Sequence, residues 1–145
     1  MFGKLVHKTA MTRFSRTLAV LLRSGVPILE ALEITSETVN NTVVARAVKE
    51  TQEAVKRGEP IAAPLERHDI FPPMVVQMLA VGEETGQVDT MLDKVAKFYD
   101  QEVEAAVDAL TSLIEPLLIA IIGGAVGAAV IALYMPMFNI IKLIQ

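Results

Sequence analysis

One uncharged stretch near the C-terminus limits what this chain can fold into. Between Pro116 and Lys142 the sequence reads LLIAIIGGAVGAAVIALYMPMFNII, without one side chain that is charged at neutral pH. A helix that crosses a bilayer needs about 20 mainly apolar residues. The alternative is a buried helix of a soluble protein, but buried helices seldom run this long without a charge. The stretch predicts a transmembrane helix over 116–141, followed by a short tail over 142–145.

Small residues follow a helical spacing within this predicted span. Gly123 and Gly127 stand one helical turn apart, with Gly124 between them and Ala120 and Ala128 beside them. Small side chains at this spacing let two helix backbones approach closely in lipid. Gly123, Gly124 and Gly127 are therefore our candidates for helix packing in the membrane.

The residues before the span suffice for one small domain with its own core, which we place at 1–115. Aromatic residues make up only 5% and Trp is absent, which favours aliphatic helix packing. The net charge of −4, without a basic patch, argues against nucleic acid as a partner. Cysteine is absent, so a disulfide framework and a thiolate metal site are excluded, as fits a cytoplasmic domain. The N-terminus lacks the apolar core of a signal peptide.

Charge is distributed unevenly along this domain. Five basic residues precede the first acid, Glu30: Lys4, Lys8, Arg13, Arg16 and Arg23. Between Tyr99 and Pro116 stand five acids without a base: Asp100, Glu102, Glu104, Asp108 and Glu115. The two segments either pack side by side or form two separate solvated faces.

Apolar periodicity predicts an all-α fold with six helices and no strand. We expect these helices over about 10–24, from Pro27 to near Asn40, over about 42–57, over about 61–67, from Pro73 to Gly82, and from Val88 through Pro116 into the span. Glycine just after a helix and proline at its start support these bounds. The glycines that end helices are Gly25 and Gly58, and the prolines that begin them are Pro27, Pro72 and Pro73.

An internal echo links two of these boundaries. Gly25-Val-Pro27-Ile28 with Leu32-Glu33 recurs further along the chain as Gly58-Glu-Pro60-Ile61 with Leu65-Glu66. The spacing between the two copies suits a helical solenoid, in which a third copy would begin with glycine at position 91. The residue there is Met91. The other interpretation, a single turn chemistry used twice, is the one we favour.

The residues make no positive case for catalysis. His7 and His68 lie in separate segments without metal-ligand spacing, and we expect both at the surface. A phosphate-binding loop and a nucleophile elbow are absent from the sequence. We therefore expect a protein that is not an enzyme and has no resident cofactor.

The stretch Gly82-Glu83-Glu84-Thr85-Gly86 is open to three interpretations. It is a tight turn bracketed by the two glycines, with Thr85 or Asp89 capping the next helix. Alternatively, it is a rigid acidic loop that a partner binds. As a third option, Glu83 joins Glu30 around a calcium ion, which prefers carboxylate oxygens.

The chain resembles the F-protein family of type II secretion systems, whose members are the inner-membrane platform proteins of these systems and of type IV pili. The resemblance lies in Asn41 and Gly58 and in the blocks RFSRTLAVLLRSGVPILEAL (13–32), FPPMVVQMLAVGEETGQVDTML (71–92), IEP (114–116) and YMPMF (134–138).

This resemblance implies a six-helix antiparallel bundle that continues into one C-terminal transmembrane helix. Family members have two related helical domains and three membrane spans, and this chain is similar to the second cytoplasmic domain with the last span. The bundle would lie on the cytoplasmic side of a bacterial inner membrane, and the tail over 142–145 in the periplasm.

The implied role is an assembly platform that couples a cytoplasmic ATPase to the extraction of pilin or pseudopilin subunits. The implied partners are that ATPase, the pilin, other inner-membrane assembly proteins and further copies of the chain. The positions that match the family pattern are Gly25, Pro27, Pro72, Pro73, Gly82, Glu83 and Gly86. A tail-anchored helical-repeat adaptor that binds cytoplasmic proteins is the alternative.

The chain departs from the family pattern at two places. IAAPLERH (61–68) replaces a serine-rich helix start. Some relatives bind calcium with acids near the positions of Glu30 and Glu83, but Gln87 stands here where another acid is expected. The implied calcium site is correspondingly weakened.

Overall fold

The chain is all-α, as predicted. A computed structural model describes residues 2–143, and the side chains of 3–136 and 138. Six helices form in these residues, without a strand between 2 and 143: α1 (Phe2–Arg23), α2 (Ile28–Thr38), α3 (Thr42–Lys56), α4 (Ala62–Glu66), α5 (Pro73–Thr85) and α6 (Val88–Leu143). They form two compact units, Met1–Glu104 and Ala105–Gln145, described separately below as unit 1 and unit 2.

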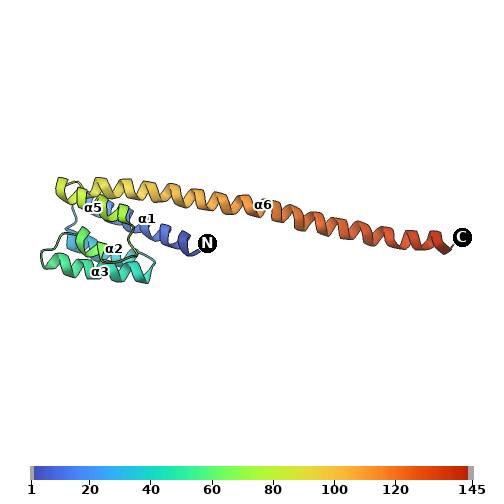
Figure 1. Ribbon diagram of the computed structural model, residues 1–145, viewed down its shortest axis with the longest axis horizontal. Coiled ribbons are helices and arrows are strands. Elements are labelled where there is room, and N and C mark those ends of the chain that lie inside the picture. The colour runs from blue at the N-terminus through green and yellow to red at the C-terminus, as the bar shows by residue number, and fades with distance from the viewer. Residues whose placement is uncertain (1, 144–145) are drawn as a thin grey trace. The chain divides into compact units, whose positions relative to one another are not determined.

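Unit 1 is a bundle built around α1. Figure 1 shows α1 between the pair formed by α2 and α3 and the pair formed by α5 and the first turns of α6. The short helix α4 packs against both α3 and α5. Each pair is joined by a short connection, so its two helices run antiparallel, as the bundle prediction requires.

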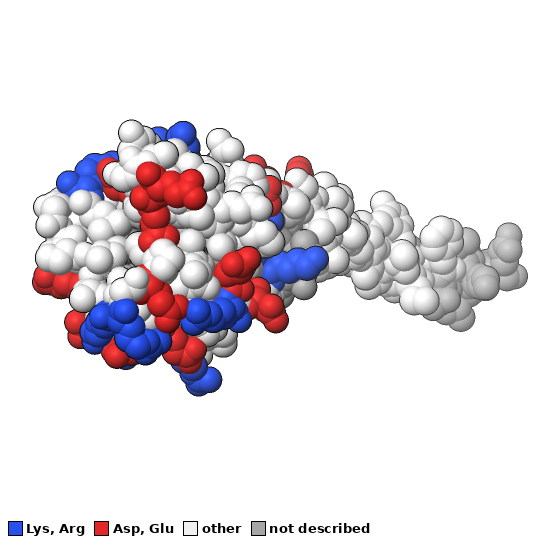
Figure 2. Space-filling view, turned by 60° about the vertical axis from the view of Figure 1, so that its left-hand side comes forward, with Lys and Arg blue, Asp and Glu red and all other residues white. Residues whose placement is uncertain are grey.

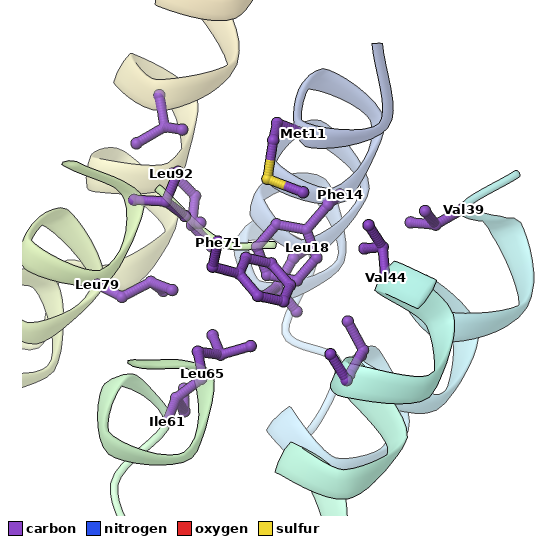
Figure 3. Packing of buried hydrophobic residues seen from close by; sticks show 14 of the residues in the cluster. Met11, Phe14, Leu18, Val39, Val44, Ile61, Leu65, Phe71, Leu79 and Leu92 are labelled. Carbon is purple, nitrogen blue, oxygen red and sulfur yellow. The ribbon is translucent and has the colours of Figure 1, made fainter. Parts of the chain in front are cut away.

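The core of unit 1 contains side chains from all six helices. In Figure 3, Phe14 and Leu18 of α1 meet Leu65 of α4 and Phe71 of the connection before α5. The rings of Phe14 and Phe71 lie edge to face with centroids 5.0 Å apart. Most other core residues are aliphatic, and among the described residues this is the one aromatic pair that joins α1 to the connection before α5.

Ion pairs join α1 to the first part of α6. Lys8 Nζ lies 2.5 Å from Glu102 Oε2, and Arg16 pairs with Asp100. Residue numbers rise along α1 as they fall along α6, so the two helices are antiparallel. The basic segment therefore packs beside the start of the acidic segment, at Asp100 and Glu102. These pairs are partly exposed, and each contributes only a few tenths of a kcal/mol to about 1 kcal/mol.

The glycine stops end α1 and α3 in the same way. Gly25 and Gly58 have left-handed backbones, with φ of 84° and 93°. After each glycine, the next amide donates to a carbonyl on the last turn of the helix: Val26 to Leu21 at 3.0 Å, and Glu59 to Ala54 at 3.1 Å. This bond defines the Schellman motif, in which a residue without Cβ is strongly favoured. The echo between Gly25 and Gly58 is therefore one turn chemistry used twice.

One prediction for α1 and one for α4 are wrong. α1 begins at Phe2 instead of near residue 10. Its first turns carry both apolar and charged residues and become helical because Ala10, Met11 and Lys8 contact the rest of the bundle. Pro64 lies in the first turn of α4, where a missing amide costs no hydrogen bond, so it does not weaken that helix as expected.

The start of α3 gives a direct test of these local interactions. Asn41 Oδ1 accepts hydrogen bonds from the amides of Val43 (3.0 Å) and Val44 (3.1 Å). We expect Asn41→Ala to lower the free energy of unfolding by about 1 kcal/mol, because it removes this cap. The neighbouring Asn40 is exposed, so Asn40→Ala is a matched control that should stay within about 0.5 kcal/mol of the wild type in thermal unfolding.

A buried hydroxyl in α1 gives a prediction of the opposite sign. Ser15 is fully buried, and its Oγ has no hydrogen-bond partner. Ser15→Ala should raise the free energy of unfolding by up to about 1 kcal/mol, because the desolvation cost of that oxygen disappears. Ser36 is also buried, but its Oγ donates to the Glu33 carbonyl at 2.7 Å. Ser36→Ala should therefore destabilise the bundle, and equal effects of the two substitutions would contradict this account.

Unit 2 consists of the remainder of α6. The helix continues through Pro116, as predicted, and through Pro136. An 18-residue window of α6 has a mean hydropathy of 2.5, and no part of that window is buried. Among the described helices, α6 is the one long and apolar enough to cross a membrane. An apolar helix face of this length left uncovered is typical of a segment that lies in lipid.

Candidate functional site

Helix ends from all parts of unit 1 meet around one hollow. Its volume is about 450 Å³, and its lining comes from the ends of α1, α3 and α5 and the starts of α2, α4 and α6: Leu22, Ile28, Val55, Glu59, Ile61, Glu83, Gly86, Val88 and Asp89. Figure 2 turns this end of the bundle toward the viewer, with acidic side chains across the centre and basic ones mainly along the lower edge. We call this surface the loop end.

The GEETG stretch is helical for most of its length, which corrects the first of its three interpretations, a turn bracketed by the two glycines. α5 continues through Thr85, so Gly82 lies inside the helix. Gly86 alone makes the turn, with φ of 70°, and the amide of Gln87 donates to the Gly82 carbonyl at 2.8 Å. Thr85 does not cap α6, because its hydroxyl donates back to Val81 at 2.7 Å. The helix extends because this C-terminal motif needs only one left-handed residue.

Gly82 has a packing role that the sequence prediction missed. It is buried, and a Cβ added to it would lie 2.8 Å from the Cα of Val88 and 3.3 Å from the carbonyl oxygen of Gln87. Both neighbours are backbone atoms, which cannot rotate away. Only glycine therefore lets α5 and the start of α6 lie this close together.

Glu83 also has a structural role within the bundle. Its Oε1 accepts from the amide of Ile61 at 2.5 Å, and its Oε2 accepts from the amide of Ala62 at 3.0 Å. These amides lie at the start of α4, where backbone donors have no partner within the helix and a negative charge is favoured. Glu83 thus fixes α4 to α5, whereas the adjacent Glu84 is exposed.

The prolines singled out in the sequence all stand at helix starts. Pro27 precedes α2, and its carbonyl accepts from the amide of Ala31 at 2.9 Å. Pro72 precedes α5, and Pro73 is its first residue. Proline suits these positions because its fixed φ matches the helix start and its missing amide would have no partner there. Pro72 and Pro73 lie at the opposite end of α5 from Gly86, so the seven matched positions do not form one site.

In the described part of the chain, no set of side chains could supply the ligands that the calcium interpretation requires. There is no group of three or more His, Asp or Glu side chains among those residues that could hold a metal ion. Glu30 is exposed, and both carboxylate oxygens of Glu83 already accept backbone hydrogen bonds. Calcium requires six to eight oxygen ligands, which Glu30 and Glu83 alone would not supply.

Both histidines help to hold the connection between α4 and α5. His7 Nε2 lies 2.6 Å from the carbonyl oxygen of Ile70, and His68 Nε2 lies 3.2 Å from Glu50 Oε2. The two rings are only partly exposed, so our expectation of simple surface residues was incomplete. The contact of His7 joins segments far apart in the chain, and no local sequence pattern predicts such a contact.

In unit 2, the three glycines proposed for membrane packing have open surroundings. A Cβ added at Gly123, Gly124 or Gly127 would meet no described atom within 4 Å. Their backbone is accessible to a neighbouring helix, which is the condition that close helix packing in lipid requires.

Comparison with known proteins identifies the family. The model of the family described as type II secretion system (T2SS), protein F, matches residues 14–136. The chain belongs to this family. The match includes most of the bundle and of the apolar helix, so the resemblance seen in the sequence motifs is confirmed.

Individual members of the F-protein family match the chain almost from end to end. It is 47% identical over 99% of its length to the type IV pilus assembly protein PilC of Myxococcus xanthus, and 52% identical over 97% to PilC of Thermus thermophilus. It is 34% identical over 98% to the type II secretion system protein F of Pseudomonas aeruginosa. These alignments include 34%, 35% and 35% of the three relatives, so the chain spans about a third of the length of the curated relatives it matches.

Proposed function

We propose that the chain is a platform domain of a type IV pilus assembly machine, coupling a cytoplasmic ATPase to the extraction of pilin. The family match carries this proposal, together with an α-helical bundle attached to an apolar helix. Identities of 47% and 52% to pilus assembly proteins, against 34% to a secretion protein, favour pili over secretion.

The proposal places the bundle over 1–115 in the cytoplasm, the span over 116–141 in the inner membrane, and the tail over 142–145 in the periplasm. Residues 144 and 145 of that tail lie outside the described residues. The amphipathic pattern with acids up to Glu115, followed by an uncharged stretch that ends at Ile141, supports the boundary near Pro116.

The absence of cysteine allows this orientation to be measured directly. Glu84→Cys places a single thiol on the exposed surface of α5. We expect a membrane-impermeant maleimide to label it in inverted inner-membrane vesicles and not in intact spheroplasts, because only the former expose the cytoplasmic side. The reverse pattern would contradict the proposed orientation.

Photo-crosslinking in native membranes tests the partners. A photoreactive residue at position 84 lies near the loop end, and one at Val43, which is 58% exposed, lies at the opposite end of α3. We expect crosslinks to the pilus assembly ATPase or to pilin from position 84, and fewer from position 43. Crosslinks from position 84 only to proteins outside a pilus or secretion machine would overturn the proposal.

Self-association through the membrane helix belongs to the same proposal. The accessible backbone at Gly123, Gly124 and Gly127 supports a close contact with a second span, from another copy or from another inner-membrane assembly protein. Gly124→Leu should weaken such a contact by about 1–2 kcal/mol. Unchanged oligomer populations of the variant in membranes would exclude this face as an interface between copies.

The adaptor alternative has less support than the platform. It requires a groove between stacked helix pairs, whereas unit 1 is a closed bundle whose core draws on all six helices. For catalysis, neither the family match nor the described side chains give a positive argument, so we retain the expectation that the protein is not an enzyme.

A further inference from the structure

The hollow at the loop end combines an apolar floor with an acidic rim. The floor consists of five aliphatic side chains: Leu22, Ile28, Val55, Ile61 and Val88. Only Ile61 belongs to the buried core, and the other four are partly buried residues packed against it. The hollow therefore exposes aliphatic surface to solvent, although burying that surface would be favourable.

The rim carries three carboxylates, and no Lys or Arg lines the hollow. Glu59 hydrogen-bonds Arg67 at 2.6 Å, and Glu83 accepts the two backbone bonds at the start of α4. Asp89 has weaker contacts, since its nearest base, Arg23, lies 3.8 Å away and is shared with Asp93. That distance exceeds a hydrogen bond, so Asp89 retains oxygen lone pairs for a further donor.

We propose that this hollow binds a partner protein segment in which an aliphatic side chain lies next to Lys or Arg. The aliphatic side chain would cover the floor, and the basic one would reach Asp89 at the rim. An apolar centre within a polar rim is the usual anatomy of a protein interface. Because like charges facing each other across an interface are costly, the same rim disfavours acidic segments. The inference rests on the proposed function, in which the bundle contacts other components of a machine.

A second copy of the same surface is a poor occupant. In a symmetric contact between two loop ends, each patch would face itself, so acid would face acid. Two of the bases closest to this surface, Arg57 and Arg67, already pair with Glu59. The Arg67 hydrogen bond holds the pKa of Glu59 below its ordinary value. A basic segment of another protein is therefore the better fit.

Binding can be tested on the full chain in lipid nanodiscs with labelled isoleucine methyl groups. Ile28 and Ile61 line the hollow, whereas Ile34 and Ile70 are partly buried elsewhere in unit 1 and serve as internal controls. The probes are short peptides that differ only in whether one leucine is flanked by arginines or by glutamates. We expect the arginine peptide to shift the NMR signals of Ile28 and Ile61, and to bind at least about tenfold more tightly than the glutamate peptide.

A pair of variants separates the effect of the rim carboxylate on peptide binding from the effect of net charge. Asp89→Asn should weaken binding of the arginine peptide by about threefold, as expected for one exposed charge pair. Glu84→Gln removes the same charge from an exposed residue outside the lining, and should leave binding unchanged. Equal binding of both peptides, equal effects of both variants, or shifts that miss Ile28 and Ile61 would overturn the inference. Each of these results concerns the hollow alone, since pilus assembly is tested separately.

Discussion

Gly82→Ala should destabilise the bundle by about 2–3 kcal/mol, although alanine is usually the better residue inside a helix. Gly82 lies in α5, where replacement by alanine would normally contribute about 0.5–1 kcal/mol of stability. Its new Cβ, however, would lie 2.8 Å from the Cα of Val88 and 3.2 Å from its amide nitrogen. To remove this overlap, α5 and the start of α6 must move apart, which also disturbs the turn at Gly86 and the floor of the hollow.

Gly3→Ala is the matched control for this substitution. Gly3 is also a helical glycine, in α1, but a Cβ there would meet no described atom within 4 Å. Its replacement should be neutral or slightly stabilising. Thermal unfolding of both variants in detergent, followed by circular dichroism, measures the difference. If Gly82→Ala unfolds at the same temperature as Gly3→Ala, the close approach of α5 and α6 is wrong.

Glu83→Ala should lower the free energy of unfolding by about 2–3 kcal/mol, since it leaves two backbone amides at the start of α4 without their charged acceptor. Ile61 and Ala62 are both buried, so water replaces the lost carboxylate poorly. Hydrogen exchange of the α4 region should accelerate more than exchange in α2, because α4 has only five residues and depends on its neighbours.

The adjacent Glu84 provides the control for Glu83. Glu84→Ala removes an equal charge from the same helix, at an exposed position. Its effect should stay within about 0.5 kcal/mol. A similar loss of stability in both variants would show that net charge matters at this site and that the cap on α4 does not.

The sequence predicted the helices well because their signals are local. Most boundaries seen in the structure follow from the apolar stripes, from the glycines that end helices at Gly25 and Gly58, and from the prolines that begin them at Pro27 and Pro73. The start of α1 was missed because its first turns have no clear stripe of their own. They are helical because of contacts with distant segments, such as the pair of Lys8 and Glu102.

The loop end was harder to predict because its interactions join residues far apart in the chain. Glu83 bonds the amides of Ile61 and Ala62, and no spacing rule links an acid in one helix to the start of another. The same holds for the packing of Gly82 against Val88, which depends on the angle between α5 and α6. The hollow itself forms only when six helix ends are brought together.

Replacement of the matching segment in a pilus protein tests the central claim most directly. We would substitute this chain for the aligned part of the Myxococcus xanthus PilC, to which it is 47% identical, and count surface pili. In a parallel experiment, the chain would replace the aligned part of the Pseudomonas aeruginosa type II secretion protein F, with secretion as the readout. Pili on cells with the first chimera, and weak or absent secretion with the second, are the predicted result. A stable, membrane-inserted first chimera that makes no pili while the second secretes normally would contradict the assignment to pilus assembly.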